Sequence, residues 1–595
     1  MSATLDLAVV GNCQVAALVD RMARVVWMCL PRPDGDPVFG ALLGGEAAAG
    51  AGEFAIELQG ARESRQRYVG HSAVLETVIM DGSGGSIRVT DFCPRFSARG
   101  RFFRPVSLVR IVEPLSGRPV VRLRLDPRRD YGRAAPERSW GSSHLRFSGG
   151  GYTWRVTTDA SVQAIVEERA FVLDRGVTML LGPDEPLEQS VARTGRQFLE
   201  DTLGYWQEWV RGLAVPFEWQ EPVIRAAITL KLCTYEDTGA VLAALTTSIP
   251  EAPSSGRNWD YRYCWLRDAY FVIRALNRLG TTRTMESFLH YIDNVVAQAG
   301  EVGLQPLYGL SGETGLTERV AESLDGYRGM GPVRVGNQAY EQVQHDVYGS
   351  LVLALTQSFF DSRLVRQGDA SLFRRLEPFG ERAVALYDTP DAGIWEYRGR
   401  KRPHTFSAVM CWAAADRLAR IAAALGLEDR AAYWGSRAET MHARILAAAW
   451  DPAVGAFTGA FGHPSLDSSC LLLAELGFIE PTDPRFVSTV EVIRRELGEG
   501  RLLMRYREED DFGRPDTAFT VCTFWYINAL AAIGRREEAR ELFEFVLSKR
   551  NALGLLSEDL DPASGELWGN FPQTYSMVGI VDCAVRLSRS WEEAL

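Results

Sequence analysis

The stretch RNWDYRYCWLRDAYFVIRAL, Arg257–Leu276, leads from an aromatic, charged segment straight into an apolar helical run. Four rings stand in its first half, at Trp259, Tyr261, Tyr263 and Trp265. An Arg267–Asp268 pair then opens the helix. Rings and charges held at the start of a rigid helix are typical of a binding site built on loops. The fold around this stretch follows from the helices on either side of it.

The second half of the chain is helical, and its links alternate in length. Short links follow the even-numbered segments, and long links of roughly 15 to 40 residues follow the odd-numbered ones. Because short links join antiparallel neighbours, the long links gather at one end. Six helical hairpins predict an (α/α)6 barrel. Its twelve segments have helical apolar periodicity at 221–235, 266–280, 283–299, 338–360, 368–387, 405–425, 427–449, 466–477, 483–497, 515–533, 535–549 and 572–589.

The first 190 residues show strand patterns instead. SAVLETVIMDGSGGSIRVTDF, Ser72–Phe92, has two β-rich runs around an Asp81–Gly85 turn and predicts a hairpin. Further short alternating runs with glycine-rich turns predict an antiparallel β-sandwich. We therefore expect a mainly α protein in which a sandwich (1–190) and a helical linker (191–218) precede the barrel (219–595).

Composition and charge indicate which binding partners and which cellular setting to expect. The net charge of −11 argues against nucleic acid and against an anionic membrane. The nine cysteines are scattered, include no CxxC pair, and are expected to be buried free thiols. The start, MSATLDLAVVGNCQ, has no basic region followed by a long apolar run, which predicts a reduced, cytoplasmic setting.

The long links carry aromatic rings beside carboxylates, with arginines nearby. Sugars suit this mixture, because pyranose C–H faces pack on rings and hydroxyls pair with charged groups. Two carboxyl groups also perform glycoside cleavage, one as acid and one as base or nucleophile. HExxH, GxSxG, Walker and GxGxxG signatures are absent from the sequence. The residue pattern alone leaves open which carboxylates would act.

Several motifs in order resemble glycoside hydrolase family 15, which holds glucoamylases, glucodextranases and microbial α,α-trehalases. They are GRNWDYRYCWLRDA, LTER…LDGYRG, GIWEYRG, RYREED and GLLSEDLDPASGELWGNFPQTYS. The opening VVGNCQVAAL…VVWMCLPRPDGDPVFGALL is similar to the N-terminal β-domain of the bacterial trehalase-like branch. The resemblance spans nearly the whole chain and also implies an (α/α)6 barrel behind a β-sandwich.

The resemblance implies residue roles. Glu396 matches the general acid and Glu558 the general base. Arg267 and Asp268 match the pair that grips the hydroxyls of the terminal glucose; a helix-start ion pair is the alternative reading of this pair. Further substrate-binding positions are matched by Tyr261, Trp265, Tyr327, Trp395 and Arg505.

The implied reaction is exo-acting hydrolysis of an α-glucoside with inversion, which releases β-glucose. The two carboxyl groups of an inverting enzyme stand roughly 6.5–9.5 Å apart. A cytoplasmic enzyme with no starch-binding module favours α,α-trehalose as the small-molecule substrate. Hydrolysis of maltooligosaccharides or another small α-glucoside, and a catalytically silent carbohydrate-binding protein, are the alternatives. No cofactor or metal is required, while activation by phosphate or Mg²⁺ stays open.

Three positions depart from the family pattern. Tyr397 replaces a second glutamate found in fungal members, and Asp516 and Met577 stand where bacterial members carry other residues. We expect these three departures to shape the leaving-group side of the pocket.

Overall fold

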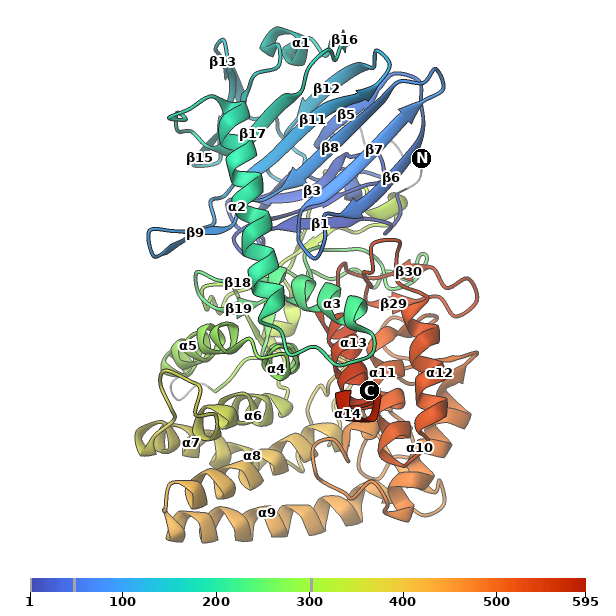
Figure 1. The fold of residues 1–595 in the computed structure, drawn as a ribbon. Helices are drawn as coiled ribbons and strands as arrows, with labels where there is room; N and C mark the ends of the chain where they lie inside the picture. The colour runs from blue at the N-terminus through green and yellow to red at the C-terminus, as the bar shows by residue number, and fades with distance from the viewer. Residues whose placement is uncertain (1–2, 46–49, 300–302, 595) are drawn as a thin grey trace.

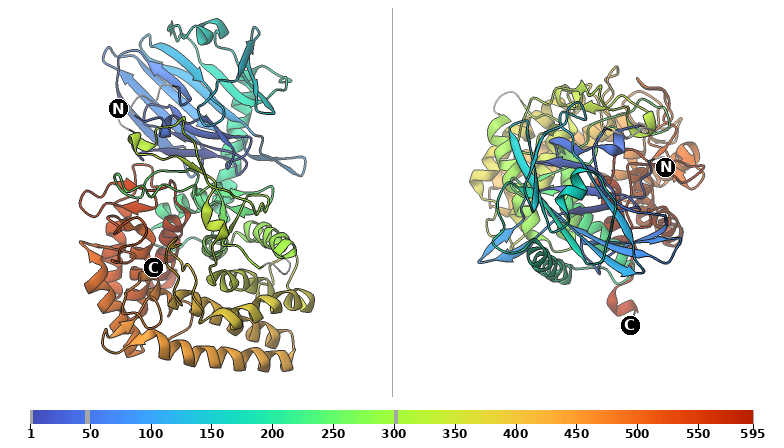
Figure 2. Two further views of the ribbon diagram at one scale, coloured as in Figure 1. Left: turned by 180° about the vertical axis from the view of Figure 1, so that it is seen from behind. Right: turned by 90° about the horizontal axis from the view of Figure 1, so that it is seen from above.

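The computed structural model describes residues 3–45, 50–299 and 303–594. A body of strands lies above a body of helices, and the long helix α2 (Val191–Arg211) runs beside the strands toward the helices (Figure 1). The view from behind shows the same division, and from above the strands cover the helical body (Figure 2). The predicted order of sandwich and helical barrel is confirmed.

Two antiparallel sheets form the N-terminal body and share one hydrophobic core. The predicted hairpin is present between β7 (Leu75–Asp81) and β8 (Ser86–Phe92), where Asp81 Oδ1 accepts the backbone N–H of Ser83 and of Gly85. One sheet contains β1 (Ala8–Gly11), β2 (Ala16–Val19), β3 (Val25–Leu30), β4 (Asp36–Phe39), β5 (Glu53–Leu58), β12 (Val120–Asp126) and β16 (Phe171–Val172). The other contains β13 (Glu137–Trp140), β14 (His144–Gly149), β15 (Tyr152–Thr158), β17 (Val177–Pro183), β11 (Leu108–Ser116), β8 (Ser86–Phe92), β7 (Leu75–Asp81) and β6 (Ala61–Tyr68).

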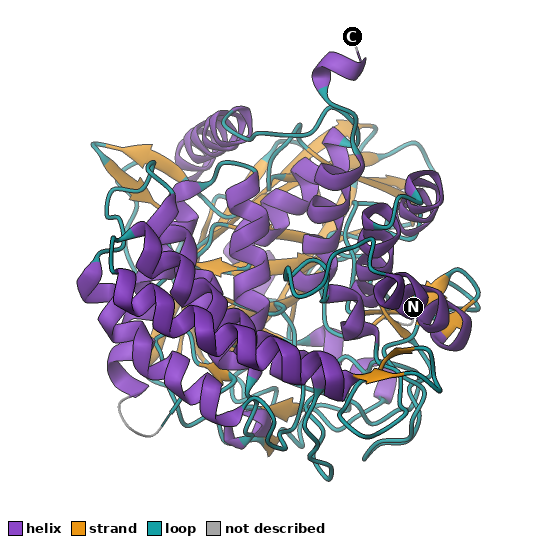
Figure 3. Cartoon of the chain, turned by 90° about the horizontal axis from the view of Figure 1, so that it is seen from below, coloured by secondary structure: helices purple, strands orange, loops and turns teal. Residues whose placement is uncertain are grey.

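The helices pack as an inner and an outer ring. Each inner member packs on the next, and the last packs on the first, so the ring closes. The inner members are α4 (Leu266–Arg278), α6 (Asp346–Phe360), α8 (Thr405–Ala424), η4 (Ser468–Leu472), α11 (Thr520–Ala532) and α13 (Thr574–Leu587). The outer members are α3 (Gln220–Leu232), α5 (Thr282–Ala299), α7 (Ala370–Leu386), α9 (Glu428–Ala449), α10 (Pro484–Leu497) and α12 (Arg536–Leu547). Figure 3 shows these helices from below, with the strands behind them.

The fourth inner member differs from its prediction. The α-helix predicted at 466–477 is instead the short 3₁₀ helix η4 followed by turns. Asp467 accepts the N–H of Ser469 at its start, and Gly477 adopts a left-handed conformation at the end (φ +78°). The apolar run between these two signals is too short for a stable α-helix and takes the tighter 3₁₀ form.

Three other boundaries were predicted too long. The segment predicted at 338–360 is a separate 3₁₀ turn, Gln338–Glu341, followed by α6. The segment predicted at 515–533 begins as an extended pair, Ala518–Phe519, and becomes helical only at Thr520. The linker helix α2 ends at Arg211 rather than 218. Both inner helices therefore begin later than predicted, which leaves more chain to the loops before them.

All nine cysteines are free and buried, as predicted. Among the helices that the structure describes, none is long and apolar enough to cross a membrane.

The sandwich braces the first of the long loops, which we number by order along the chain. Trp27 of β3 is buried in the core of the helical body, and its Nε1 donates to the carbonyl of Leu245 at 2.8 Å. Arg262 of loop one, between α3 and α4, pairs with Asp260 and donates to the carbonyl of Gly35 in the sandwich. The loop that carries the opening stretch is thus fastened to the sandwich at two points.

Candidate active site

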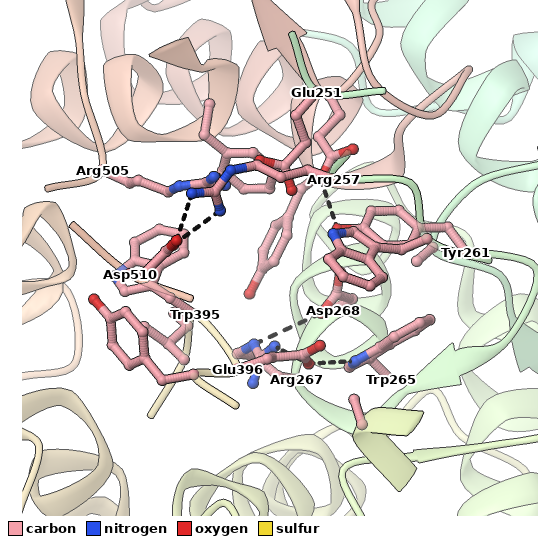
Figure 4. A pocket seen from close by; sticks show the side chains of 18 of the residues that line it. Glu251, Arg257, Tyr261, Trp265, Arg267, Asp268, Trp395, Glu396, Arg505 and Asp510 are labelled. Atoms are coloured by element: carbon pink, nitrogen blue, oxygen red, sulfur yellow. Dashed lines mark hydrogen bonds and ion pairs between the residues drawn. The ribbon is translucent and has the colours of Figure 1, made fainter. Parts of the chain in front are cut away.

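A pocket of about 900 Å³, counting its open mouth, lies among the long loops and the starts of the inner helices. The first turns of α4 and α13 contribute Arg267, Asp268 and Tyr575, α11 contributes Trp525, and most of the other lining residues come from loops (Figure 4). Eight of the nine residues predicted for the site line it. They are Glu396, Glu558, Tyr261, Trp265, Arg267, Asp268, Trp395 and Arg505.

Glu396 occupies a strained position in loop three, between α7 and α8. Its φ of +60° is left-handed, a conformation that costs a residue with a Cβ about 1–3 kcal/mol. Its Oε1 accepts Trp265 Nε1 at 2.6 Å and Gln344 Nε2 at 3.3 Å, and lies 3.4 Å from Arg267 Nη2. The carboxyl is therefore aimed into the pocket by three donors.

Glu558 is fully buried in loop six, between α12 and α13. Its Oε1 accepts the hydroxyl of Tyr261 at 2.6 Å, and its Oε2 accepts the backbone N–H of Asn570 at 3.2 Å. Gly569 has to be glycine, because a Cβ there would stand 2.6 Å from that of Glu558, at a φ of +74°. Backbone and side chain together hold this carboxyl in one position.

Burial raises the pKa of Glu558 well above the ordinary glutamate value. The negative charges of Glu251 and Asp559 raise it further, whereas the Tyr261 hydroxyl and the Arg505 guanidinium oppose this rise. Arg505 itself forms an ion pair with Glu251. The carboxyl groups of Glu251, Glu558 and Asp559 thus lie around the guanidinium of Arg505.

The two carboxyl groups are tied to a single aromatic pair. Tyr261 and Trp265 stand four positions apart, and their rings meet nearly edge to face with centroids 5.4 Å apart. Tyr261 donates to Glu558 and Trp265 donates to Glu396. The opening stretch therefore sets the relation between the two carboxyls.

Arg267 and Asp268 form a buried charged floor beside Glu396 (Figure 4). Arg267 Nη1 donates to Gln344 Oε1 at 2.9 Å and pairs with Asp346 at 3.1 Å. Burial, opposed by Arg267, raises the pKa of Asp268 to about 7. Both residues lie in the first turn of α4 and line the pocket, so the helix-start pair is also part of the site.

Trp395 forms another wall and is fixed from behind. Its Nε1 donates to Asp467 Oδ2 at 2.8 Å, and its ring packs against Phe519 and Trp525. Burial raises the pKa of Asp467 to about 6. Trp395 thereby links loop three to the start of η4.

Tyr327 does not line the pocket. Its ring is fully buried against Trp568, and its hydroxyl donates to the backbone carbonyl of Ala3. The family resemblance alone implies a substrate-binding role for Tyr327. Its contacts with Ala3 and with Trp568 of loop six instead place it in the interior, outside the pocket.

The three residues that depart from the family pattern lie in different surroundings. Tyr397 lines the pocket, but Met577 is fully buried in α13 and Asp516 is exposed, and neither of these two lines it. The expectation that all three shape the leaving-group side is therefore wrong for Met577 and Asp516.

Sequence reasoning missed Glu251, Arg257, Gln342 and Asp510, all of which line the pocket. Glu251 stands before the proline- and serine-rich run APSSG, where no ring marks it. Asp510 forms a two-pronged pair with Arg257, with contacts of 2.6 and 2.8 Å. Only contacts between loops far apart in sequence identify these residues.

Comparison with known proteins gives consistent results. Residues 220–585 match the model of glycosyl hydrolases family 15, and residues 4–170 match that of a trehalase-like N-terminal domain. Trehalases of Mycolicibacterium smegmatis and Mycobacterium tuberculosis are each 33% identical, over 99% of this chain and 92% and 90% of theirs. A bacterial glucoamylase complexed with acarbose has the same fold, with a TM-score of 0.70 and 14% identity over 99% of this chain and 94% of its own.

Proposed function

The chain belongs to glycoside hydrolase family 15 and is a glycoside hydrolase, and on that premise we propose that it hydrolyses α,α-trehalose with inversion. The observation that carries the proposal is the pair of carboxyls, Glu396 and Glu558, held by neighbouring rings over a pocket with a charged floor. No metal or cofactor is part of this proposal.

In the proposed mechanism, Glu396 donates a proton to the glycosidic oxygen as the bond to the anomeric carbon breaks. Glu558, ionised, takes a proton from a water molecule that attacks the opposite face of the sugar. The raised pKa of Glu558 makes it a stronger base, and Tyr261 keeps its carboxylate aimed by one hydrogen bond. Arg267 and Asp268 hold hydroxyls of the glucose whose anomeric carbon reacts.

The choice of trehalose rests on the relatives. Proteins named trehalase match this chain from end to end, sandwich included, in bacteria and in the archaeon Thermoplasma volcanium, whose enzyme is 32% identical over 98% of this chain. Buried charged residues, Arg267 and Asp268, line the pocket, which suits removal of one glucose at a chain end.

Glucose release from trehalose, maltose, maltotetraose, isomaltose and soluble starch tests the proposal. Each substrate is assayed alone and again with phosphate and Mg²⁺, so that activation by either is detected. Strong preference for trehalose supports the proposal. A rate that rises with chain length would instead indicate glucoamylase-like activity, and release of a sugar phosphate would indicate a phosphorylase.

Two variants separate turnover from binding. Glu396→Gln and Glu558→Gln each remove one proton-transfer group and are expected to lower kcat by about 10²–10⁴-fold. Binding of trehalose by calorimetry should persist in both. Binding without turnover in the unaltered protein would point to a carbohydrate-binding protein.

A further inference from the structure

We propose that a collar of five residues closes the pocket just beyond the leaving sugar and restricts the substrate to disaccharides. The collar consists of Trp259, Glu318, Arg334, Arg398 and Phe512. This inference rests on the proposed function, because it concerns the substrate length that the same site accepts.

The centre of the collar is an aromatic and cationic stack that joins three loops. The guanidinium of Arg398, from loop three, lies 4.3 Å from the ring centre of Trp259 in loop one. The ring of Phe512, from loop five, meets Trp259 edge to face with centroids 5.0 Å apart. All three residues line the pocket. Cation–π contacts of this kind stabilise by about 0.5–2 kcal/mol.

Glu318 adds loop two, between α5 and α6. Its carboxylate pairs with Arg334 at 3.1 Å and with Arg398 at 2.9 Å, and only 9% of its side chain is exposed. Arg334 in turn lies 5.0 Å from the Trp259 ring centre. One carboxylate thus holds two guanidinium groups against the same ring.

The turn that presents Phe512 is fastened on both sides. Arg257 of loop one grips Asp510 and donates to the carbonyl of Gly513 at 2.8 Å. On the other side, Asp511 Oδ2 accepts the backbone N–H of Arg398 at 2.7 Å. Phe512 therefore stays beside Trp259, although 36% of it is exposed.

Chain position places the collar near the reacting groups, and side-chain exposure shows on which side of them it lies. Arg398 comes two residues after Glu396, and Trp259 comes two residues before Tyr261, which holds Glu558. The Arg398 side chain is 32% exposed, against 6% for Arg267 on the floor. The contact of Arg398 with Trp259 therefore lies on the solvent side of the two carboxyls, at the outer edge of the space for the leaving sugar.

One pyranose ring suits this space, since its C–H face packs on an indole ring and its hydroxyls meet guanidinium groups. A third sugar would have to pass between Trp259, Arg398 and Phe512, which already contact each other. Contacts among four loops, rather than a single side chain, therefore oppose the binding of a substrate longer than two sugars.

The test compares maltotriose with maltose, because both have the same linkage and differ by one ring. We expect the ratio of their kcat/KM values to rise at least about tenfold in Phe512→Ala, since added room in a pocket changes such ratios about 10–200-fold. Glu318→Gln keeps the shape of the side chain but removes the charge that holds Arg334 and Arg398, so it should raise the ratio in the same direction. Phe360→Ala, which alters an exposed ring at the far end of α6, is the matched control and should leave the ratio unchanged.

An unchanged ratio in both folded variants would overturn the collar, as would an unaltered protein that cleaves maltotriose as fast as maltose. If maltose is turned over too slowly, the inhibition constants of the two sugars against the working substrate give the same ratio. Failure on trehalose alone would sink the proposed substrate but not the collar.

Discussion

A glutamate with a left-handed backbone is unusual, because a residue with a Cβ seldom adopts a positive φ. Glu396 pays this conformational cost where its carboxyl meets Trp265 and Arg267. Backbone strain of this kind persists only where the surroundings fix it, and at functional sites it helps to aim a side chain. Substitutions of Glu396 should therefore affect stability through the backbone conformation and activity through the loss of the carboxyl group.

We expect Glu396→Gly to be more stable than Glu396→Ala by about 1–2 kcal/mol, because glycine has no Cβ to oppose a φ of +60°. Both variants lose the proton donor and should lose kcat together. Thermal unfolding of the pair measures the difference. Equal melting temperatures would show that the left-handed position stores no strain.

The carboxyl cluster at Glu558 predicts a pH dependence. The base acts only when ionised, so kcat/KM is lost as pH falls through its pKa. Burial and the charges of Glu251 and Asp559 raise that pKa. The acid limb of the pH profile of kcat/KM should therefore lie above pH ~4.3, the ordinary glutamate value. In Glu251→Gln a negative neighbour is lost and Arg505 is released, and both changes lower the pKa of Glu558.

The acid limb of Glu251→Gln is therefore expected at lower pH than that of the unaltered enzyme. Asp516→Asn, an exposed carboxylate outside the pocket in the same loop as Arg505, is the control and should not move the limb. A limb that moves upward in Glu251→Gln would contradict the electrostatic account of this cluster.

At the scale of elements, η4 and Trp395 depend on one carboxylate. Asp467 Oδ1 accepts the N–H of Ser469, and Oδ2 accepts Trp395 Nε1. Asp467→Asn can keep the first bond but places an N–H₂ group against the indole N–H. An unsatisfied buried donor costs about 1–3 kcal/mol, so KM for the substrate should rise about tenfold.

The matched control is Asp483→Asn. Asp483 caps α10 by accepting the N–H of Arg485 and does not line the pocket. Its KM should stay unchanged while its helix cap is altered in the same way. A similar KM in both variants would mean that Trp395 needs no fixing from η4.

Alternating link lengths predicted the barrel, because chain connectivity alone limits how hairpins can be arranged. The Trp265–Glu396 and Tyr261–Glu558 bonds could not be predicted in the same way, since each joins loops more than one hundred positions apart. Tyr327 shows the reverse error: its motif is local, whereas its burial depends on Ala3 and Trp568. The shortened η4 was missed because its apolar run has a helical period without helical length.

The whole molecule is joined through buried contacts between sandwich and barrel. Arg262 pairs with Asp260 at 2.7 Å and donates to Tyr131 and to the carbonyl of Gly35, both in the sandwich. Asp260 directly precedes Tyr261, so the sandwich supports the residue that aims Glu558. A change that weakens the junction between sandwich and barrel should therefore lower both the stability and the activity of the protein.

We expect Arg262→Ala to destabilise the protein by about 3–5 kcal/mol, because it leaves Asp260 buried without its cation. Activity should fall with stability. Arg65→Ala removes an exposed pair with Glu63 in the same sandwich and should change neither. Denaturant unfolding of the two variants measures the contrast, and matching midpoints would contradict a structural role for this junction.

Proton NMR of the first products tests most directly whether Glu396 and Glu558 hydrolyse trehalose with inversion. Inversion at one of the two α-anomeric carbons predicts equal amounts of α- and β-glucose before mutarotation. Early release of α-glucose alone would indicate retention and contradict the assigned roles of the two carboxyls.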